Sequence, residues 1–212
     1  MQERNKTIVI ATHNRHKLAE IEALLSPVCP GYVFRTLEDV GIFGDIEEDG
    51  DTFEENAVIK AKTAADAGYI GIADDSGLEV DALHGAPGVF SARYAGEPCD
   101  DAANNEKLLR ELSSVPDEKR TARFVSVIAL CFPKEENGTG TPKELVVRGE
   151  CEGVILHAYR GTGGFGYDPL FFCPEVGKTF AEVTQKEKNT VSHRARAMQR
   201  FADAVREKQI FS

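Results

Sequence analysis

The sequence predicts an α/β protein with a mixed central β-sheet flanked by helices. Short β-branched runs, typical of buried strands, alternate with segments whose apolar residues recur at helical spacing. The strand-like runs are longer in the middle of the chain, which favours a mixed sheet over a purely parallel one. No repeat, low-complexity segment or clear linker interrupts the 212 residues, so we expect residues 1–212 to form a single domain.

Composition narrows the class of protein further. The hydrophobic content of 42% excludes disorder, and no apolar run is long enough to predict a membrane span. A net charge of −10 argues against a nucleic-acid polymer as partner. The five cysteines form no C-x-x-C pair and no signal-peptide pattern is present, so we expect free core thiols and a cytoplasmic location.

The elements can be assigned in order along the chain. Strands are expected where apolar and β-branched residues cluster, at residues 7–12, 70–74, 123–132, 145–151, 154–159 and 170–172. Helices are expected after the capping residues Asn14, Thr52 and Ser192, and around Leu108 and Leu112. The first of these ends at Pro27, and the second opens with a capping box and ends near Gly68.

Two local predictions concern strand ends. Residues 145–151 and 154–159 are expected to pair as antiparallel strands joined by a tight turn at Glu152-Gly153. The run 70–74 should place Asp74 and Asp75 at the carboxyl end of its strand, where ligands bind in α/β sheets. Burying two carboxylates is costly unless a metal or a proton neutralises them, so this pair indicates a functional site.

Two further segments suit a phosphorylated ligand. Residues 12–17 (THNRHK) join a strand to a helix start, where free N–H groups and Lys17 attract anions, although ordinary capping by Asn14 explains them equally well. Six acidic residues lie between Glu47 and Glu55; they either favour the adjacent helix start, are solvated, or supply carboxylates to a Mg²⁺ ion.

The glycine-rich segment 161–168 (GTGGFGYD) contains G-x-G-x-x-G, but a turn and a strand follow it, which excludes the dinucleotide-binding interpretation. Its glycines still permit close approach of a ligand, and Phe165 or Tyr167 could stack on a base. Residues 186–200 carry a charge of +4, which indicates either a solvated helix face or an anionic ligand at the helix start. Together these features favour a Mg²⁺-dependent enzyme that acts on a phosphorylated molecule.

Two rival classes fit part of this pattern. Asp75-Ser76-Gly77 is the signature tripeptide of aspartic proteases, but its single copy would require a homodimer and leaves Asp74 and the basic segment without a role. A nucleotide-binding regulator could use the same phosphate-binding segments without turnover, which the presence of Asp75 disfavours.

Six motifs in order resemble the inosine triphosphate pyrophosphatase family, from Ile8 to Phe201. They are T-x-N-x-x-K (12–17), T-F-x-E-N-A (52–57), A-D-D-S-G-L-x-V-D (73–81), G-A-P-G-x-x-S-A-R-Y (85–94), G-T-G-G-F-G-Y-D-P (161–169) and S-H-R (192–194). The resemblance implies two lobes with an active-site cleft between them, a small-molecule nucleotide as substrate, and a homodimer. The sequence departs from the family at His13 and His16, where bacterial members often have glycine.

The resemblance also implies an activity and its residues. The reaction is hydrolysis of ITP, dITP or XTP to the nucleoside monophosphate and pyrophosphate, a house-cleaning function, with the preference among the three left open. Asp75 is implied as general base, and Glu48 with Asp75 as Mg²⁺ ligands, Glu47 remaining an alternative to Glu48. The substrate-binding residues implied are Thr12, His13, Asn14, Arg15, His16, Lys17, Ser76, Phe165, Gly166, Tyr167, Asp168, Lys188, His193 and Arg194.

Overall fold

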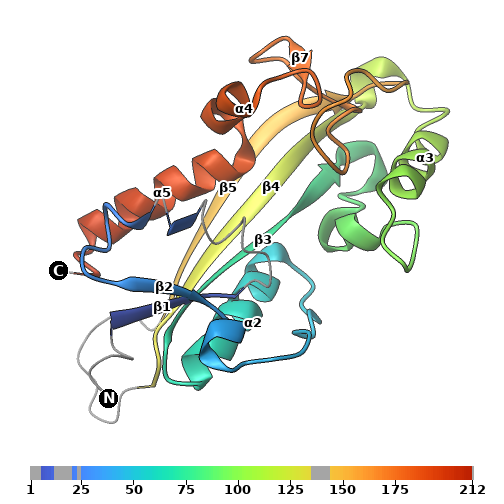
Figure 1. Ribbon diagram of the computed structural model, residues 1–212. Helices are drawn as coiled ribbons and strands as arrows, with labels where there is room; N and C mark the ends of the chain where they lie inside the picture. The colour runs from blue at the N-terminus through green and yellow to red at the C-terminus, as the bar shows by residue number, and fades with distance from the viewer. Residues whose placement is uncertain (1–5, 12–20, 23–24, 135–143, 212) are drawn as a thin grey trace. The chain divides into compact units, whose positions relative to one another are not determined.

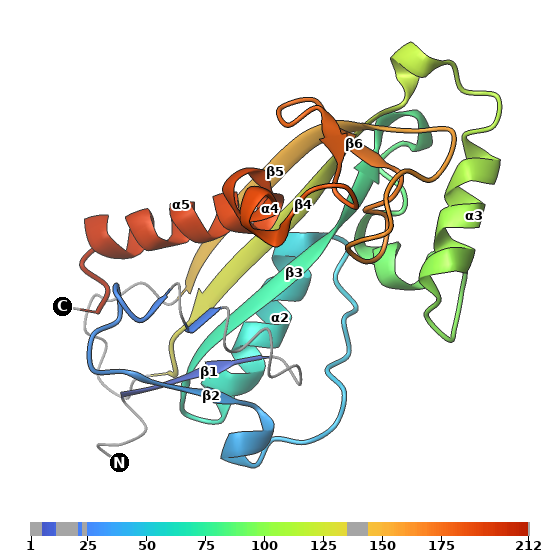
Figure 2. The same cartoon turned by 45° about the horizontal axis from the view of Figure 1, so that its top comes forward.

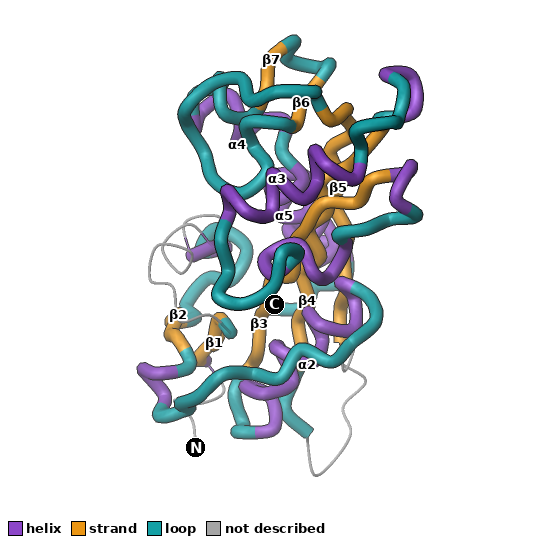
Figure 3. Tube along the Cα trace, turned by 90° about the vertical axis from the view of Figure 1, so that its right-hand side faces the viewer, coloured by secondary structure: helices purple, strands orange, loops and turns teal. Residues whose placement is uncertain are grey.

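The computed structural model describes residues 6–11, 21–22, 25–134 and 144–211 (Figure 1). The chain divides into two compact units. Unit 1 comprises Met1–Asp75, Val127–Arg148 and Ala197–Ser212, and unit 2 comprises Ser76–Ser126 and Gly149–Arg196. Helices and strands are interspersed along the chain, as expected for an α/β protein (Figure 3).

The strands form a seven-stranded mixed sheet in the order β2-β1-β3-β4-β5-β6-β7, which confirms the predicted fold class. β1 runs parallel to β2 and β3, whereas β6 runs antiparallel to β5 and β7. The strands are β1 (Thr7–Ile10), β2 (Val33–Thr36), β3 (Ile70–Val80), β4 (Thr121–Cys131), β5 (Glu144–Ile155), β6 (Phe171–Cys173) and β7 (Lys178–Thr179). The helices are α2 (Phe53–Asp66), α3 (Asp101–Glu111), α4 (Gln185–Val191) and α5 (His193–Glu207).

In unit 1, the alternation of side chains along β3 separates two packing faces. Ile70 and Ile72 belong to a hydrophobic cluster with Met198 and Phe201 of α5. Gly71 lies on the opposite face, against α2, which runs beside β1 and β3 (Figure 2). A Cβ atom at Gly71 would lie 2.0 Å from the Ala61 carbonyl oxygen, so the helix can approach the strand only because this residue is glycine.

Unit 2 has its own aromatic core. Phe124, Phe171 and Phe180 pack together, with ring centroids 4.6 to 5.8 Å apart. Leu108 and Leu112 from the α3 segment are buried in the same cluster, which confirms the predicted helix there.

Two strand predictions were wrong. β3 continues to Val80 because Leu78 and Val80 remain buried, so Asp74 and Asp75 lie within the strand and not at its carboxyl end. β5 is one continuous strand through Glu152-Gly153, with no turn. Gly153 permits close packing of the neighbouring strand, since a Cβ atom there would lie 2.5 Å from the Phe172 carbonyl oxygen.

Two predicted helix caps are confirmed. Thr52 and Glu55 form the predicted capping box of α2, and the Ser192 hydroxyl accepts a hydrogen bond from the Ala195 amide in the first turn of α5. All five cysteines are free, and all except Cys99 are buried. No helix among the described residues is long and apolar enough to cross a membrane. Most of the helix predicted between Asn14 and Pro27 lies outside the described residues.

Candidate active site

The predicted catalytic carboxylate, Asp75, forms a buried cluster with two other charged side chains of unit 1. The Lys60 ammonium lies 2.6 Å from Asp75 Oδ1 and 3.1 Å from Glu48 Oε2. Lys60 and Asp75 are each only 9% exposed, and the Glu48 side chain is one-third exposed. The cluster therefore joins a buried carboxylate to a partly accessible one through a single cation.

Regular secondary structure places Lys60 and Asp75 opposite each other. Asp75 is four residues beyond Gly71 on β3. Because side chains alternate along a strand, Asp75 lies on the same face as Gly71, toward α2. Lys60 falls in the buried stripe of α2 that also contains Ala57, Ala61 and Ala64. Small alanine side chains let this helix pack closely on the sheet, and the lysine then reaches the carboxylate.

The loop before α2 holds Glu48 near Lys60. The Asn56 side chain accepts a hydrogen bond from the Gly50 amide at 2.9 Å, and Glu55 Oε2 accepts from the amides of Asp51 and Thr52. These bonds fix the loop on the first turn of the helix. The residues of the acidic run thus have separate roles: Glu55 caps the helix, Glu54 pairs with Arg148, and Glu48 joins the buried cluster.

Burial and neighbouring charge set the pKa of Asp75. Burial raises the pKa above the usual carboxyl value, and the carboxylates of Glu48 and Asp74 act in the same direction, whereas Lys60 opposes them. Burial acts to lower the pKa of Lys60, but its ion pairs with Asp75 and Glu48 outweigh this and raise it. The sequence suggested a metal or a proton as the neutralising partner of Asp75; the structure shows a lysine.

The structure distinguishes Glu47 from Glu48, the two alternatives for the second carboxylate beside Asp75. Glu48 contacts Lys60, whereas Glu47 is exposed. The described residues contain no group of three or more His, Cys, Asp or Glu side chains that could hold a metal ion. Two carboxylates that already share one cation nevertheless suit Mg²⁺, which is commonly bound through one or two carboxylates together with substrate phosphates.

A second cluster forms in unit 2 around the glycine-rich loop. Asp168 is 2% exposed, and its Oδ2 atom accepts hydrogen bonds from Lys188 Nζ at 2.5 Å and from the Phe165 amide at 3.0 Å. The Lys188 ammonium also lies over the rings of Phe165 and Phe180, 4.9 and 5.1 Å from their centroids. The structure thus brings together Phe165, Asp168 and Lys188, three of the predicted substrate-binding residues.

This loop requires glycine at one position for two reasons. Gly164 has a φ of +74°, a conformation that L side chains rarely adopt. A Cβ atom there would also lie 2.1 Å from Asp168 Oδ2. Gly164 therefore makes room for the carboxylate that binds Lys188.

The remaining predicted residues of unit 2 lie on different elements. Tyr167 is buried and its hydroxyl donates to the Ser91 carbonyl oxygen at 2.8 Å. His193, at the start of α5, stacks on Phe124 with ring centroids 4.9 Å apart. Ser76 lies on β3 and Arg194 on α5, each partly buried.

The predicted phosphate-binding residues Thr12, His13, Asn14, Arg15, His16 and Lys17 lie outside the described residues.

The positive charge of segment 186–200 is partly compensated by acidic residues that contact it in the structure. Lys188 pairs with Asp168, and Arg196 pairs with Glu175 and donates to the Glu150 carbonyl oxygen. Acidic residues from other parts of the chain thus compensate two of its charges. An anionic ligand is not needed to explain these two cations.

Sequence reasoning missed Lys60 as a site residue. Its signal was a lysine in the i, i+3, i+4, i+7 pattern of an otherwise alanine-lined helix face. It also missed Asp101 and Asn105 of α3, which contact Gly166. Nothing in their local sequence distinguishes them from ordinary residues of a helix start.

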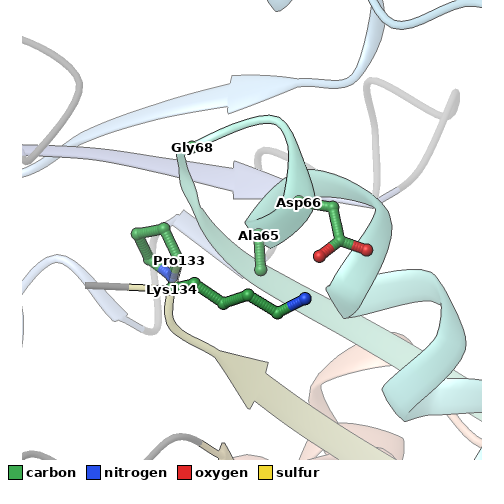
Figure 4. Close-up of a pocket in the computed structure, with 5 residues that line it drawn as sticks. All are labelled: Ala65, Asp66, Gly68, Pro133 and Lys134. Carbon is green, nitrogen blue, oxygen red and sulfur yellow. The ribbon is translucent and has the colours of Figure 1, made fainter. Parts of the chain in front are cut away.

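A cavity of about 220 Å³ lies in unit 1, near the end of α2 (Figure 4). It is lined by Ala65, Asp66, Gly68, Pro133 and Lys134. None of the predicted site residues lines it, so it does not bear on the candidate active site.

The mixed sheet, the buried Glu48–Lys60–Asp75 cluster and the Asp168–Lys188 pair define an α/β protein with an enzyme-like arrangement of charged groups. Comparison with known proteins identifies its family. The model of the Ham1 family matches residues 8–204, and the chain belongs to this family.

Individual relatives are similar in sequence to this protein over nearly the whole chain. A dITP/XTP pyrophosphatase from Desulforamulus reducens is 50% identical over 93% of this chain and 94% of its own length. A dITP/XTP pyrophosphatase from Geobacter sulfurreducens is 53% identical over 92% and 94% of the two chains. The structure of the Ham1 protein from Staphylococcus aureus superposes with a TM-score of 0.85, at 40% identity, covering 96% of this chain and all of that one. A HAM1 protein from Coxiella burnetii gives the same TM-score at 42% identity, covering 95% and 98%. The family resemblance stated from the motifs is confirmed.

Proposed function

We propose that this protein hydrolyses the non-standard purine nucleoside triphosphates ITP, dITP and XTP to the nucleoside monophosphate and pyrophosphate, and so removes them from the nucleotide pool. Relatives that are about 50% identical over more than nine-tenths of the chain are named dITP/XTP pyrophosphatases. The structural observation that carries the proposal is the buried Asp75 carboxylate, held by Lys60 beside Glu48.

Asp75 acts as the general base. A water molecule attacks the α-phosphorus and forms a new P–O bond, the bond from that phosphorus to the α–β bridging oxygen breaks, and its electron pair leaves on the pyrophosphate. Asp75 accepts the proton of the attacking water. A carboxylate whose pKa is raised by burial is a stronger base than an exposed one, and the Lys60 contact orients it.

Mg²⁺ would be held by Glu48 and Asp75, and when bound it would neutralise charge on the phosphates. The chain contributes fixed carboxylates: β3 positions Asp75, and the loop anchored on Asn56 positions Glu48. Lys17 and the other residues of segment 12–17 supply phosphate contacts in this proposal.

Unit 2 supplies base and sugar recognition. Phe165 offers an aromatic face, Lys188 and Asp168 offer polar groups, and His193 and Arg194 complete the pocket. A pocket that donates to a 6-keto oxygen leaves groups unpaired when the 6-amino group of adenine enters. This accounts for selection of hypoxanthine and xanthine over adenine.

We further propose that the protein works as a cytoplasmic homodimer. The cytoplasmic location is consistent with five free cysteines, and the dimer follows from the family resemblance alone.

The test is a pyrophosphate-release assay with ITP, ATP and GTP in the presence and absence of Mg²⁺, with peptide substrates beside it. We expect Mg²⁺-dependent pyrophosphate release from ITP, far faster than from ATP or GTP. Orthophosphate as product, equal rates on all three nucleotides, or peptide cleavage would refute the proposal. Binding of ITP without any product would favour the nucleotide-binding regulator.

A variant assigns the role of Asp75. Asp75→Asn should abolish turnover while the protein still folds and binds ITP, because the amide keeps the size of the side chain but cannot accept the proton. Retained turnover in this variant would remove Asp75 from the base role.

A further inference from the structure

Helix α3 holds the glycine-rich loop through two side chains. Asp101 Oδ2 accepts a hydrogen bond from the Gly166 amide at 2.6 Å. Asn105 Nδ2 donates to the Gly166 carbonyl oxygen at 2.8 Å, and also to the Asp101 carbonyl oxygen at 2.8 Å. Both backbone polar groups of Gly166 are therefore bound by the same turn of one helix. We refer to Asp101 and Asn105 as the α3 clamp.

The Asn105 amide is committed to this contact. Its NH₂ group faces two carbonyl oxygens, so the opposite orientation of the amide would bring oxygen against oxygen. The residue is 2% exposed, and its Oδ1 atom has no hydrogen-bond partner among the described residues. An unpaired buried acceptor lowers stability. A leucine of similar size would avoid that cost, but it would also lose the two hydrogen bonds that the Asn105 amide donates.

The residues on either side of Gly166 are also bonded. The Phe165 amide donates to Asp168, and the Tyr167 hydroxyl donates to Ser91. Phe165, in contrast, is left 67% exposed. The loop thus presents an accessible aromatic face and is held at three consecutive residues, through the backbone of Phe165 and Gly166 and the side chain of Tyr167, the arrangement expected of a preorganised binding surface.

We propose that Asp101 and Asn105 are positioning residues for base selection: the α3 clamp holds Gly166 so that the Phe165 ring and the neighbouring polar groups meet the purine in one orientation. This inference rests on the proposed function, because it assigns the clamp to the base pocket of that reaction. Neither residue contacts the base in the proposal; both act through Gly166. Without the clamp the loop moves, so the protein still binds the phosphates through segment 12–17 but discriminates poorly between 6-keto and 6-amino purines.

The principal variant is Asn105→Leu, which removes both donors and the unpaired acceptor. We expect little change in melting temperature, because the lost hydrogen bonds and the removed unpaired acceptor act in opposite directions, together with faster amide hydrogen exchange in residues 161–168 and a roughly tenfold lower ratio of kcat/KM for ITP to that for ATP. The loss should appear mainly as a higher KM for ITP, since the carboxylates of unit 1 are untouched.

Asn104→Leu is the matched control. Asn104 lies beside Asn105 on α3 and is equally buried, but its side chain bonds backbone groups of Ala95, Ala92 and Ser91 and none of Gly166. We expect this variant to lower the melting temperature and to keep the ITP-to-ATP ratio of the unmodified protein. If Asn104→Leu lowered the ITP-to-ATP ratio of kcat/KM as much as Asn105→Leu does, the proposal would be overturned, because the effect would then reflect a general disturbance of α3.

Asp101 provides a second test that does not depend on Asn105→Leu folding. Asp101→Asn keeps an acceptor for the Gly166 amide, whereas Asp101→Ala removes it. We expect the alanine variant to lose discrimination and the asparagine variant to recover most of it. If the unmodified protein releases pyrophosphate from ITP but all clamp variants keep its ratio and its hydrogen exchange, the clamp proposal fails and the proposed function stands. If the unmodified protein shows no such activity, the proposed function fails, while the exchange measurement still reports whether the clamp holds the loop.

Discussion

Lys60→Met tests whether Lys60 is what allows Asp75 to be buried. Methionine keeps an unbranched apolar stem of about the same length and removes the ammonium group, with its charge and its hydrogen-bond donors. Removing one partner of a buried ion pair typically costs about 3–5 kcal/mol, because the other charge stays behind in a medium that solvates it poorly. Lys60 and Asp75 are each 9% exposed and only 2.6 Å apart, so this range applies with little correction for solvent screening. Glu48 loses the same partner, which places the expected loss of unfolding free energy in the upper part of the range.

The assay is urea unfolding near neutral pH in metal-free buffer, with the free energy taken by linear extrapolation. Lys62→Met is the matched control: Lys62 is on the same helix, but its pair with Glu144 is exposed and spans 3.5 Å, so we expect a loss of less than about 1 kcal/mol. The double variant Lys60→Met/Asp75→Asn should be more stable than Lys60→Met alone, since the uncompensated charge is gone. A loss for Lys60→Met no larger than for Lys62→Met, or no recovery in the double variant, would refute the reasoning.

Three other predictions follow from local geometry. Gly164→Ala should unfold at a lower temperature than Gly166→Ala and should bind ITP more weakly. Both glycines have a positive φ, but only a Cβ atom added at Gly164 would contact Asp168. Similar melting temperatures and ITP affinities for the two variants would contradict this prediction. A thiol reagent near pH 8 should modify at most Cys99 in the native protein and all five cysteines in denaturant. The reason is that the other cysteines are buried, and burial raises the pKa of Cys29 and Cys151 to about 12. Rapid labelling of more than one thiol in the native protein would contradict this prediction. The hydrogen bond from Thr121 and the charge of Arg123 hold the pKa of Asp81 below its ordinary value of 3.8, so its stabilising effect is present above that value and is lost as pH falls through the native pKa. Asp81→Asn should therefore be slightly less stable than the unmodified protein at pH 7, with a difference in melting temperature that shrinks below pH 3.8.

The sequence was most informative where a signal is local. The capping box at Thr52 and the N-cap at Ser192 are confirmed, because a cap involves residues only three positions apart. Thr184 and Glu187 form a second capping box, which starts α4, a helix absent from the sequence prediction. The local signals in this sequence therefore mark more helix starts than the prediction contained.

The errors concern strands, whose partners are distant in the sequence. Glu152-Gly153 resembles a turn when taken alone, yet Gly153 is glycine because β6 packs closely against it. Two acidic residues at Asp74 and Asp75 resemble the end of a strand, yet β3 continues to Val80, and Lys60 of α2 compensates the charge of Asp75. In both cases the deciding neighbour comes from an element that the local pattern does not contain.

The same reasoning explains which site residues could be predicted. Asp75, Asp168 and Lys188 were identified because they belong to motifs or to unusual charge patterns. Lys60 and Asn105 were not, because a lysine or an asparagine in a helix is common and each acts by contacting another site residue. A lysine on a face otherwise lined by alanine can be recognised only by asking what would neutralise it in the interior. Since burial requires a partner for every charge, each buried carboxylate predicted from a sequence implies a search for a cation on the neighbouring element's buried face. Here that search leads from Asp75 to α2, where Lys60 is the lysine in the stripe that contains Ala57, Ala61 and Ala64.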